Sequence, residues 1–334
     1  HIDSVYAGGK FDGPLGVVGA IAAVRALKAQ RPRPARPVEV FVSCEEEDSR
    51  FICDFWGSRA ILGTIHLGEA EALRDADGVV MADAMREYGL DPSRVGEAKR
   101  TDVAAFLELH IEQGPVLDAE GISLGVVEAI SGLNRTRVRV QGRADHAGTT
   151  PVSLRSDALV AASAMVLAVR QLAEEFGEPA RATVGSLNVR PNQPNIVAGE
   201  VELIVDSRHP DRALQQQLVQ AASRRCQEIG AALGVVVETE VLVDQTPTPM
   251  NPAMVARIEQ AIQRRGWSYR RLVSGAGHDS QILGRQIPTA MIFVPSRAGR
   301  SHSPAEFTPN EQLLPGVQTL ADVLVELADD EVTV

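Results

Sequence analysis

The sequence predicts an α/β protein in which a larger domain, built on a mostly parallel sheet, is interrupted by a smaller ferredoxin-like α+β domain. Its length of 334 residues suits two domains better than one small core. Short, nearly continuous apolar runs near both ends of the chain are typical of strands buried in a parallel sheet. Between them lies a stretch in which apolar and polar residues alternate, as in strands with one solvated face.

The first segment of the larger domain begins with a helix over residues 16–28, where apolar residues recur at helical spacing. A proline-rich stretch ends this helix, and VEVFVS at residues 38–43 is predicted to be a buried strand. Residues 51–100 are expected to form helices and loops. AAFLEL at residues 104–109 is predicted to be a second buried strand, and it ends at His110.

The character of the sequence changes near residue 130. Two long amphipathic helices alternate with four strands in the order β-α-β-β-α-β, which is that of a ferredoxin-like sandwich. The expected elements are strand 135–141, helix 153–176, strands 182–189 and 201–206, helix 211–233 and strand 235–243. The larger domain then resumes with helix 251–265, strand 288–294 and helix 311–327. We therefore place the domain boundaries at 1–129, 130–244 and 245–334.

Composition excludes several classes of function. The formal net charge is -11 and the 33 basic residues form no Lys/Arg run, which argues against a nucleic-acid partner and against an anionic membrane. No apolar run approaches the roughly 20 residues that span a bilayer, and no signal-peptide pattern stands at the start. Three cysteines fit neither a disulfide framework nor a thiolate zinc site and indicate a reducing compartment. We expect a cytoplasmic protein.

The first twelve residues place an imidazole and two carboxylates around a glycine turn. In a His-X-Asp pair the imidazole binds a metal while the nearby carboxylate, here Asp3, orients the ring of His1. Asp12 follows a Gly-Gly turn, where the backbone can bend sharply enough to aim its carboxylate back at His1. The alternative is an ordinary strand end followed by a polar loop.

Two further polar groups follow predicted strands. The four acids from Glu45 to Asp48 come directly after the first strand, which is where open α/β sheets hold their ligands. Adjacent acids repel one another and a cation would relieve this, although a solvated acidic loop is an equally weighted alternative. His110 closes the second strand, where a core or capping histidine is the common alternative.

Together these positions predict a metal centre. Two more histidines, His278 and His302, lie in loops of the last segment. The polar groups at strand ends then comprise three imidazoles and two carboxylates: His1, Asp12, Glu47, His110 and His302. Such a set suits two divalent ions, zinc or manganese with cobalt or nickel as alternatives, about 3.5–4 Å apart and bridged by one carboxylate. A spare glutamate beside the ligand glutamate would act as a general base.

Several stretches spread over nearly the whole chain also carry a family resemblance. They are HIDSVYAGGKFDGPLGV, CEEEDSRF, ELHIEQGP, DHAGTTPVSLRSD, RPNQPNIVAGEVELIVDSR, SGAGHDS and PSRAGRSHSPAE. Taken together they resemble the M20 metallopeptidase-like amidohydrolases, in the hydantoinase/carbamoylase branch. The resemblance implies a metallopeptidase-like catalytic domain interrupted by a lid and dimerisation domain. It also implies a first catalytic segment that is shorter at its N-terminus than in relatives.

The resemblance implies roles for the metal-site residues. The imidazole of His110 points to the ureido-acid branch, because peptidase relatives usually have a carboxylate there. Glu46 would be the general base, and Asp3, which orients the His1 ring, is counted with it among the catalytic residues. The five ligands would divide into Asp12 as the bridge, His1 and His110 on one metal, and Glu47 and His302 on the other.

The resemblance also gives roles to the inserted domain. His146 would stabilise the oxyanion, Asn195 and Arg208 would hold the substrate carboxylate, and Gln113 would add a polar contact. A guanidinium is the natural bidentate partner of a carboxylate. From the residues alone, His146 would be a turn histidine and Arg208 part of a strand-end ion pair. Of the remaining histidines, we expect His66 and His209 at the surface and His278 in a structural loop.

The implied activity is hydrolysis of the C–N bond of a ureido (N-carbamoyl) acid, releasing ammonia and carbon dioxide. The stretches FWGSRAILG and VDSRHPD slightly favour allantoate as the substrate. N-carbamoyl-L-amino acids, β-ureidopropionate and ureidoglycolate are the alternatives. The resemblance further implies a homodimer formed through the inserted domain. A non-catalytic binding protein of the same fold is disfavoured because Glu46, needed for proton transfer and not for metal binding, is present.

Overall fold

The computed structural model describes residues 1–329 and divides the chain into two compact units. The larger unit comprises His1–Ile130 and Thr248–Val334, and the inserted unit comprises Ser131–Pro247. In the described part of the chain, no helix combines the length and apolar character that crossing a membrane requires.

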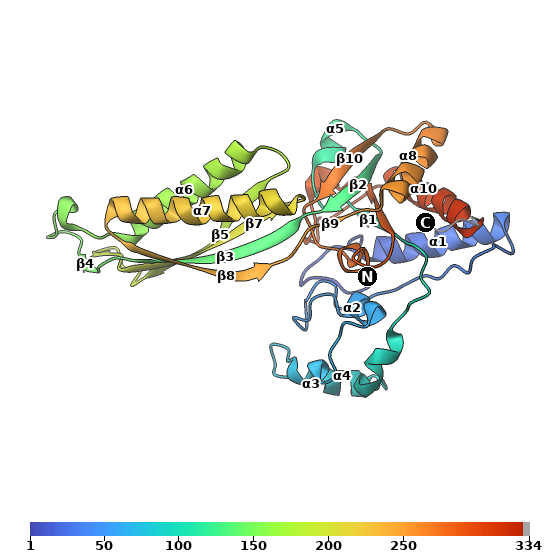
Figure 1. The fold of residues 1–334 in the computed structure, drawn as a ribbon, viewed down its shortest axis with the longest axis horizontal. Helices are drawn as coiled ribbons and strands as arrows, with labels where there is room; N and C mark the ends of the chain where they lie inside the picture. Colours follow the sequence, from blue (N-terminus) through green and yellow to red (C-terminus); the bar gives the residue numbers. More distant parts are fainter. Residues whose placement is uncertain (330–334) are drawn as a thin grey trace. The chain divides into compact units, whose positions relative to one another are not determined.

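The larger unit is built on a five-stranded mixed sheet (Figure 1). Its strands run in the order β1 (Phe106–Ile111), β11 (Thr289–Val294), β2 (Leu124–Ile130) and β10 (Tyr269–Ser274), with β9 (Thr248–Pro249) beside β2. β1 pairs with β11 and β10 with β2 in parallel, but β2 runs antiparallel to both β11 and β9. The α/β class is therefore confirmed, and the sheet is mixed, so the expected mostly parallel course is not confirmed. β2 and β10 were not predicted from the sequence.

Helices cover both faces of this sheet. α1 (Pro14–Gln30), α8 (Pro252–Arg265) and α10 (Asn310–Asp329) pack against one face, where Leu109 and Ile111 of β1 join the main apolar core. On the other face, α9 (Asp279–Leu283) packs with α2 (Trp56–Leu62). Because side chains alternate along a strand, Glu108 and His110 of β1 point away from the main core. The other short helices of the larger unit are α3 (Glu69–Ala72), α4 (Met81–Glu87), η1 (Pro92–Ala98), α5 (Val116–Glu120) and η3 (Arg297–Gly299).

Two expectations for the first segment were wrong. Residues 38–43 form neither a helix nor a ladder with another strand in the described chain. The segment is held instead by Phe41, whose ring packs edge-on against Phe106 at 6.3 Å, and by a hydrogen bond from Ile2 N to Ser43 O of 3.0 Å. The second strand also extends past its predicted end, so that His110 lies inside β1, opposite Phe293 of β11.

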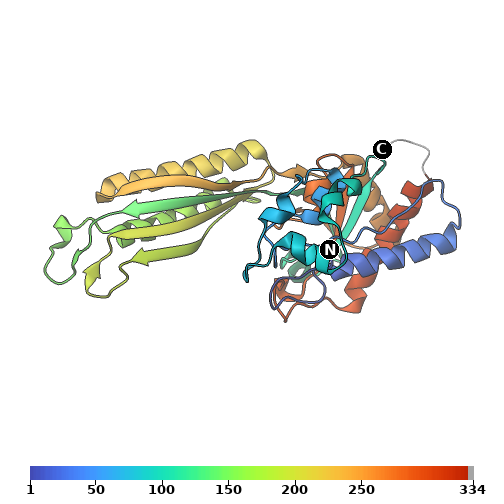
Figure 2. The ribbon, with the colours of Figure 1, turned by 90° about the horizontal axis from the view of Figure 1, so that it is seen from below.

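The inserted unit is an antiparallel sheet covered on one face by two long helices (Figures 1 and 2). Helix α6 begins at Ala158 and not at the predicted residue 153, because the Asp157 carboxylate accepts hydrogen bonds from the first backbone N–H groups of the helix. The sheet order is β5 (Arg181–Arg190), β7 (Glu200–His209), β3 (Gly132–Gln141) and β8 (Val236–Asp244), under α6 (Ala158–Phe176) and α7 (Arg212–Leu233). A separate short ladder joins β4 (Asp145–His146) to β6 (Ile196–Val197), and η2 (Val152–Leu154) precedes α6.

Candidate metal centre

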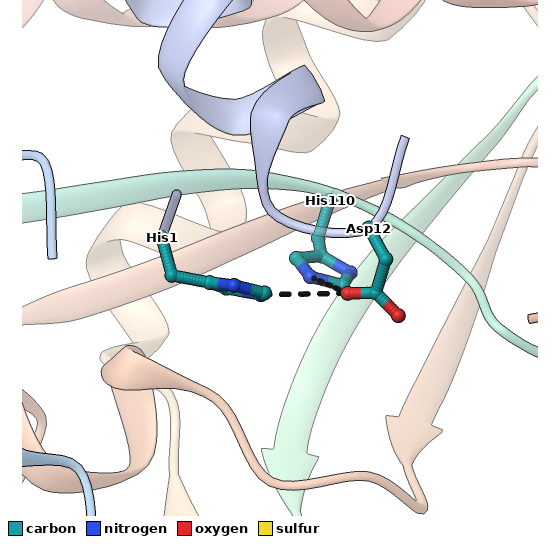
Figure 3. Close-up of side chains that lie close together, drawn as sticks. All are labelled: His1, Asp12 and His110. Carbon is teal, nitrogen blue, oxygen red and sulfur yellow. Dashed lines mark ion pairs between the residues drawn. The ribbon is translucent and has the colours of Figure 1, made fainter. Parts of the chain in front are cut away.

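One carboxylate stands at the centre of the candidate site. The Asp12 side chain is buried, and its Oδ1 atom faces two imidazoles, 3.4 Å from His1 Nε2 and 3.1 Å from His110 Nε2 (Figure 3). Its other oxygen, Oδ2, lies 3.5 Å from His302 Nε2, which in turn lies 3.4 Å from Glu47 Oε2. Asp12 therefore belongs to two groups of three residues, each with ligand atoms close enough to hold one metal ion.

The local backbone explains how the first two ligands meet. Asp12 precedes Gly13, whose φ of 82° lies in the left-handed region and turns the chain into α1. A Cβ atom on Gly13 would lie 2.7 Å from the His1 carbonyl oxygen and overlap its ring. Glycine at this position therefore lets the histidine and the aspartate approach each other.

Hydrogen bonds to both imidazoles identify the atoms that are free to bind a metal. His1 Nδ1 lies 3.1 Å from the Asp3 carbonyl oxygen, and His110 Nδ1 lies 2.8 Å from that of Ile111. Because a carbonyl oxygen only accepts, each Nδ1 carries a proton, and in the neutral ring each Nε2 presents a lone pair toward Asp12. Both Nε2 atoms are buried without a hydrogen-bond partner. Lone pairs facing a carboxylate need a cation between them, so the residues fit a metal.

The electrostatics of the site lead to the same conclusion. Burial would lower the pKa of His1, but the carboxylates of Asp12, Asp3 and Glu46 outweigh it and raise that pKa to about 12. Burial would raise the pKa of Asp12, but the surrounding imidazoles hold it far below its ordinary value. The site therefore strongly favours positive charge beside Asp12, supplied by protons or by metal ions.

The Asp3 carboxylate holds two of the four consecutive acids in place. Its Oδ2 accepts hydrogen bonds from the backbone N–H groups of Glu46 and Glu47, each at 2.9 Å. Glu46 Oε2 then lies 3.6 Å from His1 Nε2, while Glu47 points toward His302. Asp3 thus orients both the His1 ring and the acidic loop.

The two outer acids of the run serve the loop itself. Asp48 Oδ1 accepts hydrogen bonds of 2.8 Å from the backbone N–H groups of Cys53 and Asp54. Glu45 Oε2 accepts one from Phe51 N at 3.3 Å. The run therefore divides into Glu46 and Glu47, which face the site, and two acids that shape the backbone around them.

Comparison with known proteins shows the family. The family described as "Peptidase family M20/M25/M40" matches residues 1–326. The chain belongs to this family. The resemblance drawn from the sequence motifs is thereby confirmed, and the chain is a hydrolase of the M20 group.

Individual relatives and solved structures agree with this placement. The chain is 40% identical over 328 residues to an allantoate amidohydrolase of Escherichia coli (strain K12), covering 98% of this chain and 80% of the relative. It is 40% identical over 329 residues to an N-carbamoyl-L-amino-acid amidohydrolase of Paenarthrobacter aurescens, with the same coverage. An amidase of the hydantoinase/carbamoylase family from Burkholderia multivorans superposes with a TM-score of 0.93 at 33% identity, covering 99% of this chain and 80% of that one.

Gln113 lies at the candidate metal centre of this M20 hydrolase. Its Nε2 donates to Asp12 Oδ2 at 2.8 Å and lies 3.4 Å from His302 Nε2. Its Oε1 is buried and has no hydrogen-bond partner. The carboxamide therefore orients the central carboxylate with one end and offers an acceptor with the other.

The predicted residues of the inserted unit lie in two different places, at the separate β4–β6 ladder and on the four-stranded sheet. His146 is exposed at the end of β4, and its Nδ1 accepts a hydrogen bond from Gly148 N at 3.0 Å. Asn195 directly precedes β6, and its carbonyl oxygen accepts from Ala147 N at 3.0 Å. Arg208 lies on β7 and forms a two-pronged pair with Asp206, at 2.8 and 3.0 Å. The structure thus brings His146 and Asn195 to adjacent strands and holds Arg208 elsewhere.

The remaining histidines differ in environment. His66 is exposed as expected. His209 was expected at the surface, but it is buried. Its Nδ1 accepts a hydrogen bond of 2.9 Å from Asp211 N, which holds the imidazole in the turn that leads into α7. His278 is buried in its loop, with its ring 4.5 Å from that of His110 and its Nε2 2.8 Å from Ser274 Oγ.

Sequence reasoning gave no role to three acids buried around the site: Glu108, Asp279 and Glu306. Asp279 accepts hydrogen bonds from the hydroxyls of Ser43 and Ser58, which lie directly before the acidic loop and in α2. Glu108 accepts from both the N–H and the hydroxyl of Ser280. An acid inside the otherwise apolar run FLELHI was a signal that could have drawn attention to Glu108.

The raised pKa of His1 predicts that metal binding releases protons. In the metal-free protein His1 is protonated at neutral pH, and it must lose that proton before its nitrogen can bind a metal. Zinc affinity should therefore rise with pH throughout the range below that pKa, including the whole interval from about pH 6 to 8. Calorimetry of zinc binding in two buffers of different ionisation enthalpy measures the protons released. A His66→Ala control should release the same number, and a heat of binding independent of buffer would contradict the prediction.

Proposed function

We propose that the chain is a binuclear metal-dependent amidohydrolase that cleaves the C–N bond of a ureido acid, releasing ammonia and carbon dioxide. The observation that carries the proposal is the Asp12 carboxylate, which turns one oxygen toward His1 and His110 and the other toward His302. A bridging carboxylate between two ligand groups is what a two-metal hydrolytic site requires. The relatives named above supply the substrate class.

In this proposal the ligands fall into two sets that share the bridge. His1, Asp12 and His110 hold one ion, and Asp12, Glu47 and His302 hold the other. Bound there, divalent ions supply Lewis-acid chemistry, which lowers the pKa of water and polarises a carbonyl oxygen. Zinc or manganese suits these nitrogen and oxygen ligands, and cobalt or nickel would also fit them.

Glu46 is proposed as the general base. Glu46 is adjacent to Glu47 and its backbone is held by Asp3. Within the described part of the chain its carboxylate accepts no hydrogen bond from the loop backbone, unlike the carboxylates of Glu45 and Asp48. Burial raises the pKa of Glu46 well above its ordinary value, and the charge of Asp279 adds to the rise against the opposing effect of His1. Such a rise brings the pKa of a carboxylate closer to the working pH. The carboxylate can then take a proton from water and return it to the leaving nitrogen.

The substrate groups are assigned to three residues of the inserted unit and one of the larger unit. Gln113 offers its unpartnered Oε1 to a substrate N–H group. His146 would donate to the developing oxyanion, while Asn195 and Arg208 would hold the carboxylate. Allantoate is our first choice of substrate, and an N-carbamoyl-L-amino acid is the alternative, because relatives of both activities are equally similar.

The spacing of these groups supports a homodimer in which two copies build one site. Strand β7 begins at Glu200, close to the β4–β6 ladder that carries His146 and Asn195. Arg208 lies eight residues further along the same strand, roughly 26 Å at about 3.3 Å per residue. One small substrate cannot reach both ends of the sheet. We therefore propose that the inserted domain, predicted at 130–244, acts as a lid and dimerisation surface, and that His146 serves the partner's metal centre.

A non-catalytic binding protein of the same fold is the candidate from a different class. Such a protein would need the ligands but not a base. Glu46 forms a further three-residue group with His1 and Glu47, but it lies outside both ligand sets that share Asp12. Its position beside His1, as a carboxylate additional to those two sets, favours the enzyme.

A substrate panel tests the activity directly. The protein loaded with zinc or manganese should release ammonia from allantoate, or from N-carbamoyl-L-amino acids, β-ureidopropionate or ureidoglycolate. Metal content should be measured on the same sample, and chelation should abolish the release. Dipeptides serve as the control, because the proposal assigns no peptidase activity. A metal-loaded protein that releases ammonia from none of these ureido acids would favour the binding protein.

Replacing the base should separate metal binding from turnover. Glu46→Gln should keep its metal content, because Glu47 supplies the coordination, and should lose turnover by roughly 10²–10⁴-fold or more. The expected loss follows from removing the group that accepts the proton. Glu45→Gln is the matched control, since that carboxylate faces the loop backbone. Undiminished turnover in Glu46→Gln would remove the assignment.

Mixing two inactive variants tests whether His146 acts on the partner chain. Neither the Glu46→Gln homodimer nor the His146→Ala homodimer should turn over ureido acid. Their heterodimer should regain one competent site, because one subunit supplies the base and the other supplies the histidine. Recovery of activity after subunit exchange is the measurement. If exchange is demonstrated and activity does not return, His146 acts within its own chain or has no catalytic role.

A further inference from the structure

Glu306 lies against the loop that carries the central carboxylate. Only 4% of its surface is exposed, and its Oε1 accepts hydrogen bonds from the backbone N–H groups of Phe11 (2.8 Å) and Asp12 (3.0 Å). Asp12 and Glu306 are 294 positions apart in the sequence, so this contact joins two segments that are far apart along the chain. Two accepted N–H bonds fix the orientation of the peptide groups from which the Asp12 side chain projects.

The second oxygen of Glu306 reaches the same aspartate by another route. Ser301 Oγ lies 3.0 Å from Glu306 Oε2 and 2.8 Å from Asp12 Oδ2, between the two carboxylates. A hydroxyl has one proton to donate, so Ser301 donates to one carboxylate at a time and lies within hydrogen-bond distance of both. Glu306 therefore restrains the backbone of Asp12 directly and lies one hydroxyl away from its side chain.

The chain leaves space for this contact at Gly9. A Cβ atom on Gly9 would overlap the Glu306 carboxylate and lie 2.5 Å from the Cβ of Glu306. Gly9 is not among the residues with positive φ, so its backbone does not itself demand glycine. What Gly9 provides is room for the Glu306 side chain beside the Asp12 loop.

Fixing Asp12 has a direct consequence for the metal centre. Its Oδ1 must face His1 and His110 while its Oδ2 faces His302. A rotation of the side chain that improved the contacts of one oxygen would weaken those of the other. Glu306 itself belongs to none of the candidate ligand groups among the described residues. Groups that orient metal ligands without touching the metal commonly strengthen metal binding.

We propose that Glu306 is a positioning residue, which holds Asp12 so that each of its oxygens faces one half of the two-metal centre. The proposal rests on the proposed function, because it takes Asp12 as the bridging ligand. It concerns geometry and not charge: what matters is an acceptor at Oε1 and a group within reach of Ser301 at Oε2.

The affinity of the folded protein for Zn²⁺, measured by competition with a chromophoric chelator, tests the proposal without reference to turnover. Glu306→Ala, which removes the acceptor, and Glu306→Asp, which is one methylene too short, should bind Zn²⁺ about 10–100-fold more weakly than the wild type. Glu306→Gln should bind nearly as tightly as the wild type. Its Oε1 can accept both N–H bonds and its Nε2 can donate to Ser301 Oγ, whose own proton then goes to Asp12. Glu311→Ala, at an exposed glutamate at the start of α10, is the control and should not change the affinity.

Gly9→Ala and Ser301→Ala provide independent variants, which keep Glu306 but displace its carboxylate or remove its link to Asp12. Both should also weaken Zn²⁺ binding, and they replace Glu306→Ala if that variant does not fold. Unchanged affinity in the folded Glu306 variants, or a loss in Glu306→Gln as large as in Glu306→Ala, would overturn the proposal. So would a lower melting temperature of the metal-free protein with no change in affinity. A wild type that binds no Zn²⁺ would instead reject the proposed function itself.

Discussion

The structure depends on a buried carboxylate that faces three imidazole nitrogens. Removing the Asp12 carboxylate from water is unfavourable unless opposite charge or hydrogen-bond donors surround it. Gln113 and Ser301 donate to its Oδ2, and His1, His110 and His302 lie around both oxygens. The Nδ1 atoms of His1 and His110 are bonded to carbonyl oxygens, so the Nε2 atoms of the neutral rings present their lone pairs to the Asp12 carboxylate. A cation between these groups would satisfy all of them.

The fold serves this carboxylate by bringing together loops from the whole length of the larger unit. Parallel pairing of β1 with β11 sets His110 beside the strand whose exit loop carries His302. Alternation along β1 sends Leu109 and Ile111 into the apolar core and His110 to the opposite face. A rigid buried sheet therefore supports one ligand directly and fixes the start of the loop that supplies another.

The second level of organisation consists of acids that bind backbone rather than metal. Asp3 accepts hydrogen bonds from the N–H groups of Glu46 and Glu47. Asp48 accepts them from the N–H groups of Cys53 and Asp54. Glu306 does the same for Asp12. Carboxylates that accept N–H bonds are strong restraints, because a charged acceptor makes a shorter and stronger hydrogen bond. These acids explain how a site composed mostly of loop residues can be ordered.

The sequence by itself determined whatever depends on neighbours along the chain. Periodicity identified the long helices and the strands of the inserted unit, and the motifs around His1 and Glu47 identified the candidate ligands and the family. Only the tertiary structure decided the antiparallel course of β2, the absence of a ladder at residues 38–43 and the role of Glu306. Each of these depends on a partner distant in sequence: a strand needs another strand's hydrogen bonds, and a buried acid is defined by the N–H groups that fold against it.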